Sequence, residues 1–166
     1  VGVEACDVLA ARLVETIDMG KIDDRYFLTE AALIDTIAAV DIEGRYRISA
    51  ISRGSISVRN LGSGARGDGP QANAKDGLLE VVMKPQAQAP VSRWQRPEPL
   101  PETRILIRSG EIRSSDPVNV QVDNHTLNGF RFRLGIEPNK LKIITGRSRK
   151  LCPGEGGLQN SSKAYT

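Results

Sequence analysis

Residues 56–84 read ISVRNLGSGARGDGPQANAKDGLLEVVMK and carry the strongest structural signal of the chain. Both ends of the stretch alternate apolar, often β-branched residues with polar ones, which is typical of strands. Between them lie a polar, glycine-rich loop (residues 63–75) and an Asp-Gly turn at Asp76 and Gly77. The stretch therefore predicts two strands separated by a long loop and a turn.

The remaining sequence adds one helix and many short strands. Apolar residues recur at helical spacing over residues 2–16 and predict an amphipathic helix. Strand patterns follow, with turn dipeptides at Asn128-Gly129 and Pro138-Asn139. The last predicted strands are residues 103–108, 111–113, 118–122, 130–136 and 140–145. We predict a mainly β fold, an antiparallel β-sandwich or barrel-like domain with an N-terminal helix. Its buried residues should include Val118, Val120, Val122, Phe130, Phe132 and Leu134.

Length and composition indicate one globular domain. The chain has 166 residues, of which 39% are hydrophobic and 26% charged. A domain of this size buries roughly 70% of its unfolded surface. We assign residues 1–150 to the β domain and residues 151–166, which are low in apolar content, to a flexible tail. Because the chain begins at Val1 without a methionine, we expect it to be a piece of a longer protein.

The sequence predicts a cytoplasmic protein. No apolar run reaches the roughly 20 residues that a membrane span requires, and no signal peptide is present. The two cysteines, Cys6 and Cys152, lie near opposite ends, without the spacing of a metal site. Cys6 falls on the apolar side of the predicted helix, so we expect a buried thiol there.

Positive charge is concentrated near the C-terminus. Residues 131–150 hold seven cations against a single glutamate, a net charge of +6 in a chain whose total is +3. Such a face can attract phosphate or an anionic membrane surface. Arg131 and Arg133 alternate with apolar residues, however, and we interpret them as the solvated face of a strand. The role of residues 147–150 stays open.

The order of these motifs resembles the C-terminal domain of the diacylglycerol kinase-like lipid kinases, bacterial lipid kinases and sphingosine kinase relatives among them. The matching residues of the opening stretch are Asn60, Pro70, Ala72, Asp76, Gly77 and Leu79. ETIDMGKIDDRYFLTEA (residues 15–31) is similar to the family's Ile-Asp-x-Gly strand and the Tyr-Phe-Leu strand after it. PVNVQVDNHTL (residues 117–127) is similar to its Pro-x-x-Val-Gln-x-Asp-Gly-Glu turn.

The resemblance implies a lipid kinase that transfers the γ-phosphoryl group of ATP to a lipid hydroxyl. In that family a separate N-terminal domain with a Gly-Gly-Asp-Gly-Thr motif binds the nucleotide, and this sequence lacks the motif. We therefore expect Mg²⁺ and ATP in the intact protein only, with no cofactor and no catalysis in this fragment. The implied partners are a lipid substrate or membrane surface and the nucleotide-binding domain of the parent chain. A location at the membrane periphery follows, and a homodimer stays open.

Two departures from the family pattern concern the site residues. The family's paired aspartates, which help to hold a structural Mg²⁺, read Lys75-Asp76 here. A neighbouring ammonium opposes a cation, so metal binding at Asp76 is doubtful. The family's Asp-Gly-Glu turn reads Asp123-Asn124-His125, which puts the only histidine of the chain at the position of the base. The resemblance makes Asp123 and His125 the candidate catalytic residues, since imidazole can accept a proton near neutral pH.

Three functions remain to be weighed. The lipid-side domain of a kinase comes first. The alternative is a non-catalytic lipid- or ligand-binding or regulatory β module derived from that family, which the changes at Lys75 and His125 favour. A nucleic-acid-binding barrel comes last, because aromatic residues make up only 4% of the chain and single-strand binding depends on aromatic stacking. We expect no nucleic-acid partner.

Overall fold

The computed structural model describes residues 2–50, 52–61, 73–86 and 101–146 and is mostly β, with one short helix. Ten strands form a single curled sheet in which every pairing is antiparallel, in the order β2-β1-β10-β9-β3-β6-β7-β8, while β4 pairs with β9 and β5 with β4. The predicted fold class is confirmed. The elements are α1 (Gly2–Ala11), β1 (Leu13–Ile22), β2 (Arg25–Phe27), β3 (Glu30–Thr36), β4 (Ala38–Ile42), β5 (Tyr46–Ser49), β6 (Gly54–Arg59), β7 (Leu79–Pro85), β8 (Thr103–Ile107), β9 (Ser109–Val122) and β10 (His125–Thr145).

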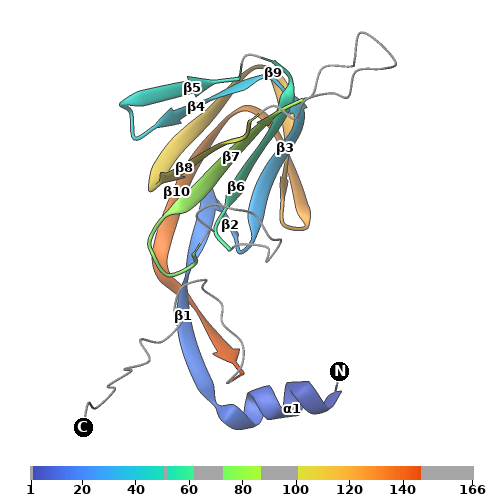
Figure 1. Cartoon of the computed structure of the whole chain (residues 1–166), viewed down its shortest axis with the longest axis vertical. Coiled ribbons are helices and arrows are strands. Elements are labelled where there is room, and N and C mark those ends of the chain that lie inside the picture. Colours follow the sequence, from blue (N-terminus) through green and yellow to red (C-terminus); the bar gives the residue numbers. More distant parts are fainter. Residues whose placement is uncertain (1, 51, 62–72, 87–100, 147–166) are drawn as a thin grey trace, which may run out of the picture.

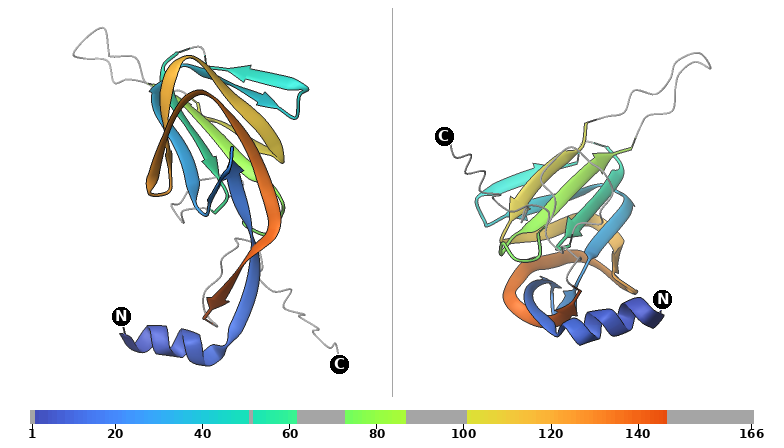
Figure 2. Two further views of the ribbon diagram at one scale, coloured as in Figure 1. Left: turned by 180° about the vertical axis from the view of Figure 1, so that it is seen from behind. Right: turned by 60° about the horizontal axis from the view of Figure 1, so that its bottom comes forward.

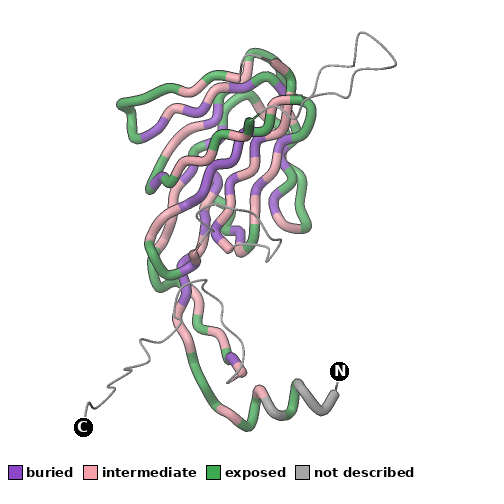
Figure 3. The backbone as a smooth tube through the Cα atoms, in the orientation of Figure 1, coloured by how far each residue is buried: buried purple, intermediate pink, exposed green. Residues whose placement is uncertain are grey.

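The sheet curls into two layers around one apolar core. In the view of Figure 1, β6, β7 and β8 lie in front of β9 and β10. Side chains from both layers meet between them, including Leu33, Ile56, Val81, Ile112 and Phe132, each at most 3% exposed. Figure 3 shows these buried positions running along the strands of the body. The alternation of buried and exposed residues follows from the two-residue period of a strand.

The strands β1 and β10 extend beyond the body as a two-stranded ribbon, with α1 at its far end (Figures 1 and 2). The predicted helix is too long: it ends at Ala11, and Leu13 already pairs with Thr145 of β10. Arg12, with φ of 51°, breaks the helix, and β-branched residues follow it, which favour a strand. The prediction for Cys6 is also wrong, because this thiol is exposed.

Two predicted turns lie inside strand β10. Asn128-Gly129 and Pro138-Asn139 do not end it; they lie beside register shifts with β9 and β1. Asn139 has φ of 54°, so the polar residue allows a local irregularity without a reversal of the chain. The register shift with β9 also explains Phe130, which is 55% exposed rather than buried. Val118 is half-buried, and the other four predicted core residues are buried.

Some expectations fall outside the described residues. These are most of the 63–75 loop, Cys152, residues 147–150 and the 151–166 tail. No helix in the described part of the chain is long and apolar enough to span a membrane.

Candidate functional site

The turn that carries Asp123 and His125 is a tight hairpin between the two longest strands. Val122 of β9 pairs with His125 of β10, which leaves Asp123 and Asn124 as the two loop residues. Asp123 has φ of 45°, a left-handed conformation that aspartate adopts more easily than most residues. The hairpin thus holds the candidate residues at one end of the sheet.

The carboxylate of Asp123 fastens this turn to the connection between β2 and β3. Its Oδ2 accepts a hydrogen bond from the Leu28 amide at 2.8 Å. Its Oδ1 accepts from the amides of Thr29 and Glu30 at 3.1 and 3.3 Å, and from the Thr29 hydroxyl. Its own amide donates to the Glu30 carbonyl at 3.0 Å. These four hydrogen bonds direct the carboxylate to residues 28–30.

These contacts also set the ionisation of Asp123. Partial burial raises the pKa of the carboxyl, but the hydrogen bonds from Thr29, Leu28 and Glu30 together outweigh it, and the pKa lies below its usual value. The group therefore stays ionised at neutral pH. The ionised carboxylate thus holds the hairpin against residues 28–30.

His125 is exposed and lines a shallow cavity of about 380 Å³. The other lining residues are Arg25, Tyr26, Val122, Asp123 and Asn124. The cavity therefore combines an imidazole, which can accept a proton, with a guanidinium, which can attract a phosphate. Sequence reasoning missed Arg25, because it belongs to β2, far from the hairpin in sequence, and no local motif marks it.

A second polar cluster centres on Asp18 of β1, which is 2% exposed. Its Oδ2 accepts a hydrogen bond from the Gly77 amide and its Oδ1 one from the Asn139 amide, both at 2.8 Å. Its own amide donates to the Ala74 carbonyl at 2.7 Å. One buried carboxylate thus joins the Asp-Gly turn, β1 and the irregular part of β10.

Asn60 links this cluster to the candidate catalytic turn. Its side-chain Nδ2 donates to the carbonyls of Asp18 and Leu28 at 2.9 and 3.1 Å, and its amide donates to the Thr29 carbonyl at 3.0 Å. Asn60 and Asp123 therefore hold the same 28–30 segment from two sides. The Oδ1 atom of Asn60 is buried and has no hydrogen-bond partner among the described residues.

Asp76 lies at the edge of this second cluster. Its Oδ1 accepts from the Leu78 amide at 2.9 Å, and the following Gly77 has φ of 70°, as the turn requires. Burial, and secondly the negative charge of Asp18, raise the pKa of the Asp76 carboxyl. The Lys75 ammonium lies 2.8 Å from Glu15 Oε2.

The oxygen atoms of Asp18 and Asp76 are not sufficient to hold a metal ion. The described residues contain no group of three or more His, Cys, Asp or Glu side chains that could hold one. Both oxygens of Asp18 already accept backbone hydrogen bonds. A cation at Asp76 would need its remaining ligands from outside the described chain, since hard cations take six or more oxygens.

Comparison with known proteins shows which solved structures share this fold. No protein-family model matches the sequence, and no curated protein does. A crystal structure of a diacylglycerol kinase from Bacillus anthracis str. Sterne superposes with a TM-score of 0.65 over 87% of this chain, at 14% identity. The chain has the fold of these diacylglycerol kinase-like proteins. Two further structures from that strain, each named as a candidate diacylglycerol kinase, give TM-scores of 0.67 and 0.66 at 12% identity, over 87% and 86% of this chain.

The chain spans about three fifths of those relatives, namely 58%, 61% and 61% of their lengths. At this identity the likeness concerns the fold. It bears out the resemblance on which Asp76, Asp123 and His125 were selected, while the roles of these residues stay predictions.

Proposed function

We propose that the chain is the C-terminal, lipid-side domain of a diacylglycerol kinase-like lipid kinase. The intact enzyme would transfer the γ-phosphoryl group of ATP to a lipid hydroxyl. The observation that carries this proposal is the likeness to three diacylglycerol kinase-like structures over 86–87% of the chain. The exposed His125, which lies on the β9–β10 hairpin and lines one cavity with Arg25, supports it.

In this proposal His125 is the general base. Its imidazole takes the proton from the lipid hydroxyl as the oxygen attacks the γ-phosphorus, and ADP leaves. Arg25, on the wall of the same cavity, draws the transferring phosphoryl group toward the hydroxyl. Asp123 is a positioning residue, because its hydrogen bonds to residues 28–30 fix the hairpin against β3. Phosphoryl transfer depends chiefly on positioning and charge, which a rigid hairpin supplies.

A second domain would bring the nucleotide. Mg²⁺ and ATP would be bound there, outside this chain, and the protein would act in the cytoplasm. Helix α1 and the ribbon of β1 and β10 offer a surface for that domain, since Leu9 of α1 and the paired Val14 and Ile144 of the ribbon are 50–61% exposed. Apolar side chains exposed in this concentration are typical of an interface.

The test is His125→Ala in the parent protein, assayed with Mg-ATP and diacylglycerol. We expect transfer to fall by about 100-fold or more, the usual contribution of a general base. The matched control is Asn128→Ala, at an exposed residue of the same strand whose side-chain amide donates a hydrogen bond to Asn119 Oδ1 at 2.8 Å. Equal turnover in the two variants would remove His125 from the mechanism.

One observation favours a second candidate, a non-catalytic lipid- or ligand-binding module. A mostly apolar cavity of about 160 Å³ opens between the ends of β3, β5, β6, β7 and β8. The Thr36 hydroxyl on its wall is buried, and no hydrogen-bond partner is found for it in the described regions. A parent protein that binds lipid with no phosphoryl transfer at any lipid tested would establish this reading instead.

A further inference from the structure

The outer surface of one sheet layer carries an unusual number of cations. Along β10, Phe132 and Leu134 point into the core, so Arg131 and Arg133 between them point outward. The pairing continues this outward row across the neighbouring strands. Arg131 of β10 lies opposite Arg113 of β9. A second line of paired residues crosses four strands: Arg133 of β10, Glu111 of β9, Asp41 of β4 and Arg47 of β5.

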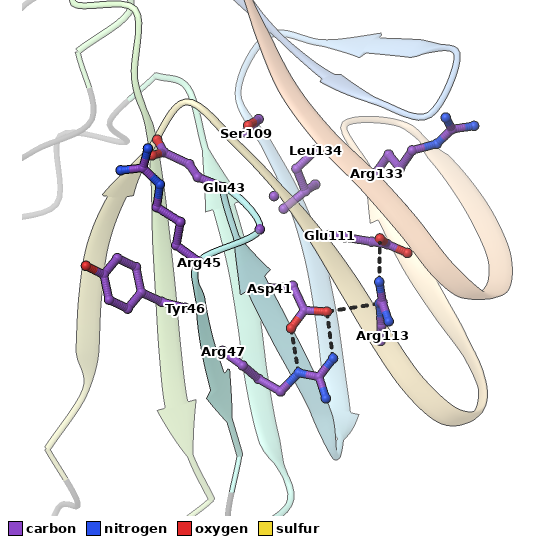
Figure 4. Close-up of a pocket in the computed structure, with 12 residues that line it drawn as sticks. Asp41, Glu43, Arg45, Tyr46, Arg47, Ser109, Glu111, Arg113, Arg133 and Leu134 are labelled. Atoms are coloured by element: carbon purple, nitrogen blue, oxygen red, sulfur yellow. Dashed lines mark hydrogen bonds and ion pairs between the residues drawn. The ribbon is translucent and has the colours of Figure 1, made fainter.

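Carboxylates neutralise this row only in part. Asp41 binds Arg47 through two hydrogen bonds, at 2.5 and 2.9 Å, and lies 3.0 Å from Arg113. Glu111 lies 3.0 Å from Arg113 and 2.5 Å from Arg131. Two carboxylates thus form ion pairs with three guanidinium groups. Figure 4 shows the Arg133 side chain on β10 apart from both carboxylates.

The same surface continues onto β1 and β2. Lys21 lies opposite Gly135 and therefore next to Arg133 along the sheet. Glu137 lies 3.6 Å from Lys21 and 2.9 Å from Lys140, and both ammonium groups lie over the Tyr26 ring, 5.6 and 5.1 Å from its centre. We call this surface the basic face. It holds six cations and three carboxylates, namely Arg47, Arg113, Arg131, Arg133, Lys21, Lys140, Asp41, Glu111 and Glu137.

Two large apolar side chains adjoin the basic face. Phe130 is 55% exposed and Ile37 54%. Phe130 precedes Arg131 on β10, and the carbonyl of Ile37 accepts a hydrogen bond from the Ser114 hydroxyl, next to Arg113. Single exposed apolar residues are ordinary, but a pair beside arginines matches the boundary between lipid headgroups and acyl chains.

We propose that the basic face docks on an anionic lipid bilayer. Its arginines and lysines meet lipid phosphates, while Phe130 and Ile37 enter the headgroup region. Figure 2, in its left view, shows β10 on the near side with β4 and β5 beside it, so this layer is open to such a contact. The proposal goes beyond the kinase reading, because it holds whether or not the protein has catalytic activity.

Docking in this way has a consequence for the candidate site. His125 precedes Arg131 by six residues on one strand, which is roughly 20 Å of extended chain. A sheet lying with this face on a bilayer keeps the His125 hairpin near the membrane surface. A lipid hydroxyl could then reach it without leaving the headgroup region.

The test is cosedimentation of the 166-residue chain with vesicles of phosphatidylcholine, with and without phosphatidylglycerol. We expect binding only to the anionic vesicles, and weaker binding as salt is raised. Arg131→Gln and Arg133→Gln should each lower the partition coefficient about fivefold, the usual effect of one basic residue at such a surface. Phe130→Ser should lower it as well, with no change in the thermal unfolding midpoint.

Matched controls lie on the other layer. Lys84→Gln removes a cation of β7 whose side chain is 50% exposed, against 62% for Arg131, and Leu106→Ser removes an apolar residue of β8 that is 42% exposed. Both should leave binding unchanged. Absent binding to anionic vesicles at low salt, or equal losses in the controls, would overturn the proposal. So would a homodimer in solution that Phe130→Ser dissociates, since a second copy would then occupy this face.

Discussion

Replacement of Asp123 by alanine tests how the candidate hairpin is held. The change removes the acceptor of hydrogen bonds from Leu28, Thr29 and Glu30. Hydrogen bonds to charged groups contribute about 1.5–3 kcal/mol each, but amides near the surface regain water. We therefore expect a loss of about 2–4 kcal/mol of unfolding free energy, a large part of the 5–15 kcal/mol typical of a domain.

The assay is urea unfolding followed by circular dichroism. With a slope of about 2 kcal/mol per molar urea, the midpoint should fall by about 1–2 M at an unchanged slope. Asp123→Asn keeps one acceptor oxygen, so its urea midpoint should lie between those of the wild type and Asp123→Ala. Asp116→Ala, at an exposed acid of the same strand β9, should change the free energy by less than about 0.5 kcal/mol.

The pH dependence gives an independent check. The folded pKa of Asp123 lies below its usual value, so the stability that its ionised form contributes is present above the unfolded pKa near ~3.9. It is lost as the pH falls through the folded pKa. The difference between the wild type and Asp123→Ala should therefore shrink on acidification. Equal midpoints for Asp123→Ala and Asp116→Ala at neutral pH would refute this account of the hairpin.

Three further predictions concern other parts of the chain. Gly20→Ala should lower the free energy of unfolding in urea by about 1–3 kcal/mol, because the added Cβ would lie 2.2 Å from the buried Phe27 ring. Gly135→Ala, whose Cβ would meet nothing within 4 Å, should not lower it. Hydrogen bonds from Lys140 and Tyr26 lower the pKa of Glu137 to about 2. The stability that ionised Glu137 contributes is therefore present above the unfolded pKa near ~4.3 and is lost toward pH 2. Glu137→Gln should flatten the dependence of the unfolding free energy on pH between these values. Calorimetric titration of the 166-residue chain with Mg-ATP should give no saturable heat at millimolar ligand, and a tight site would contradict the assignment of the nucleotide to another domain.

Local patterns in the sequence were enough to predict the fold class. Alternating apolar residues mark most strands, and the Asp123-Asn124 reversal is visible as a polar dipeptide that ends the alternating pattern of residues 118–122. The same local reasoning failed where tertiary pairing overrides a signal. Residues 13–16 have helical spacing but pair with β10. Asn128-Gly129 looks like a turn but lies inside β10, where both residues pair with β9.

The site could be predicted only in part, because its contacts join distant segments. His125 was selected because the resemblance puts it at the position of the family's base, but Arg25 reaches the same cavity from β2, and no motif marked it. Asp18 was visible only as part of a motif, since its partners, Gly77 and Asn139, lie far along the chain. The interaction of Asp123 with residues 28–30 likewise depends on the pairing of β9 with β3.

The most direct test of the central claim is a transfer experiment. The parent protein is incubated with Mg²⁺ and ATP labelled at the γ-phosphate, in mixed micelles with diacylglycerol and, separately, other hydroxyl-bearing lipids. Lipid extraction and chromatography then identify the product. The account predicts a labelled phospholipid that the wild type and Asn128→Ala form and His125→Ala does not. Absence of labelled lipid from every substrate, with a parent protein shown to be folded and to bind ATP, would contradict it.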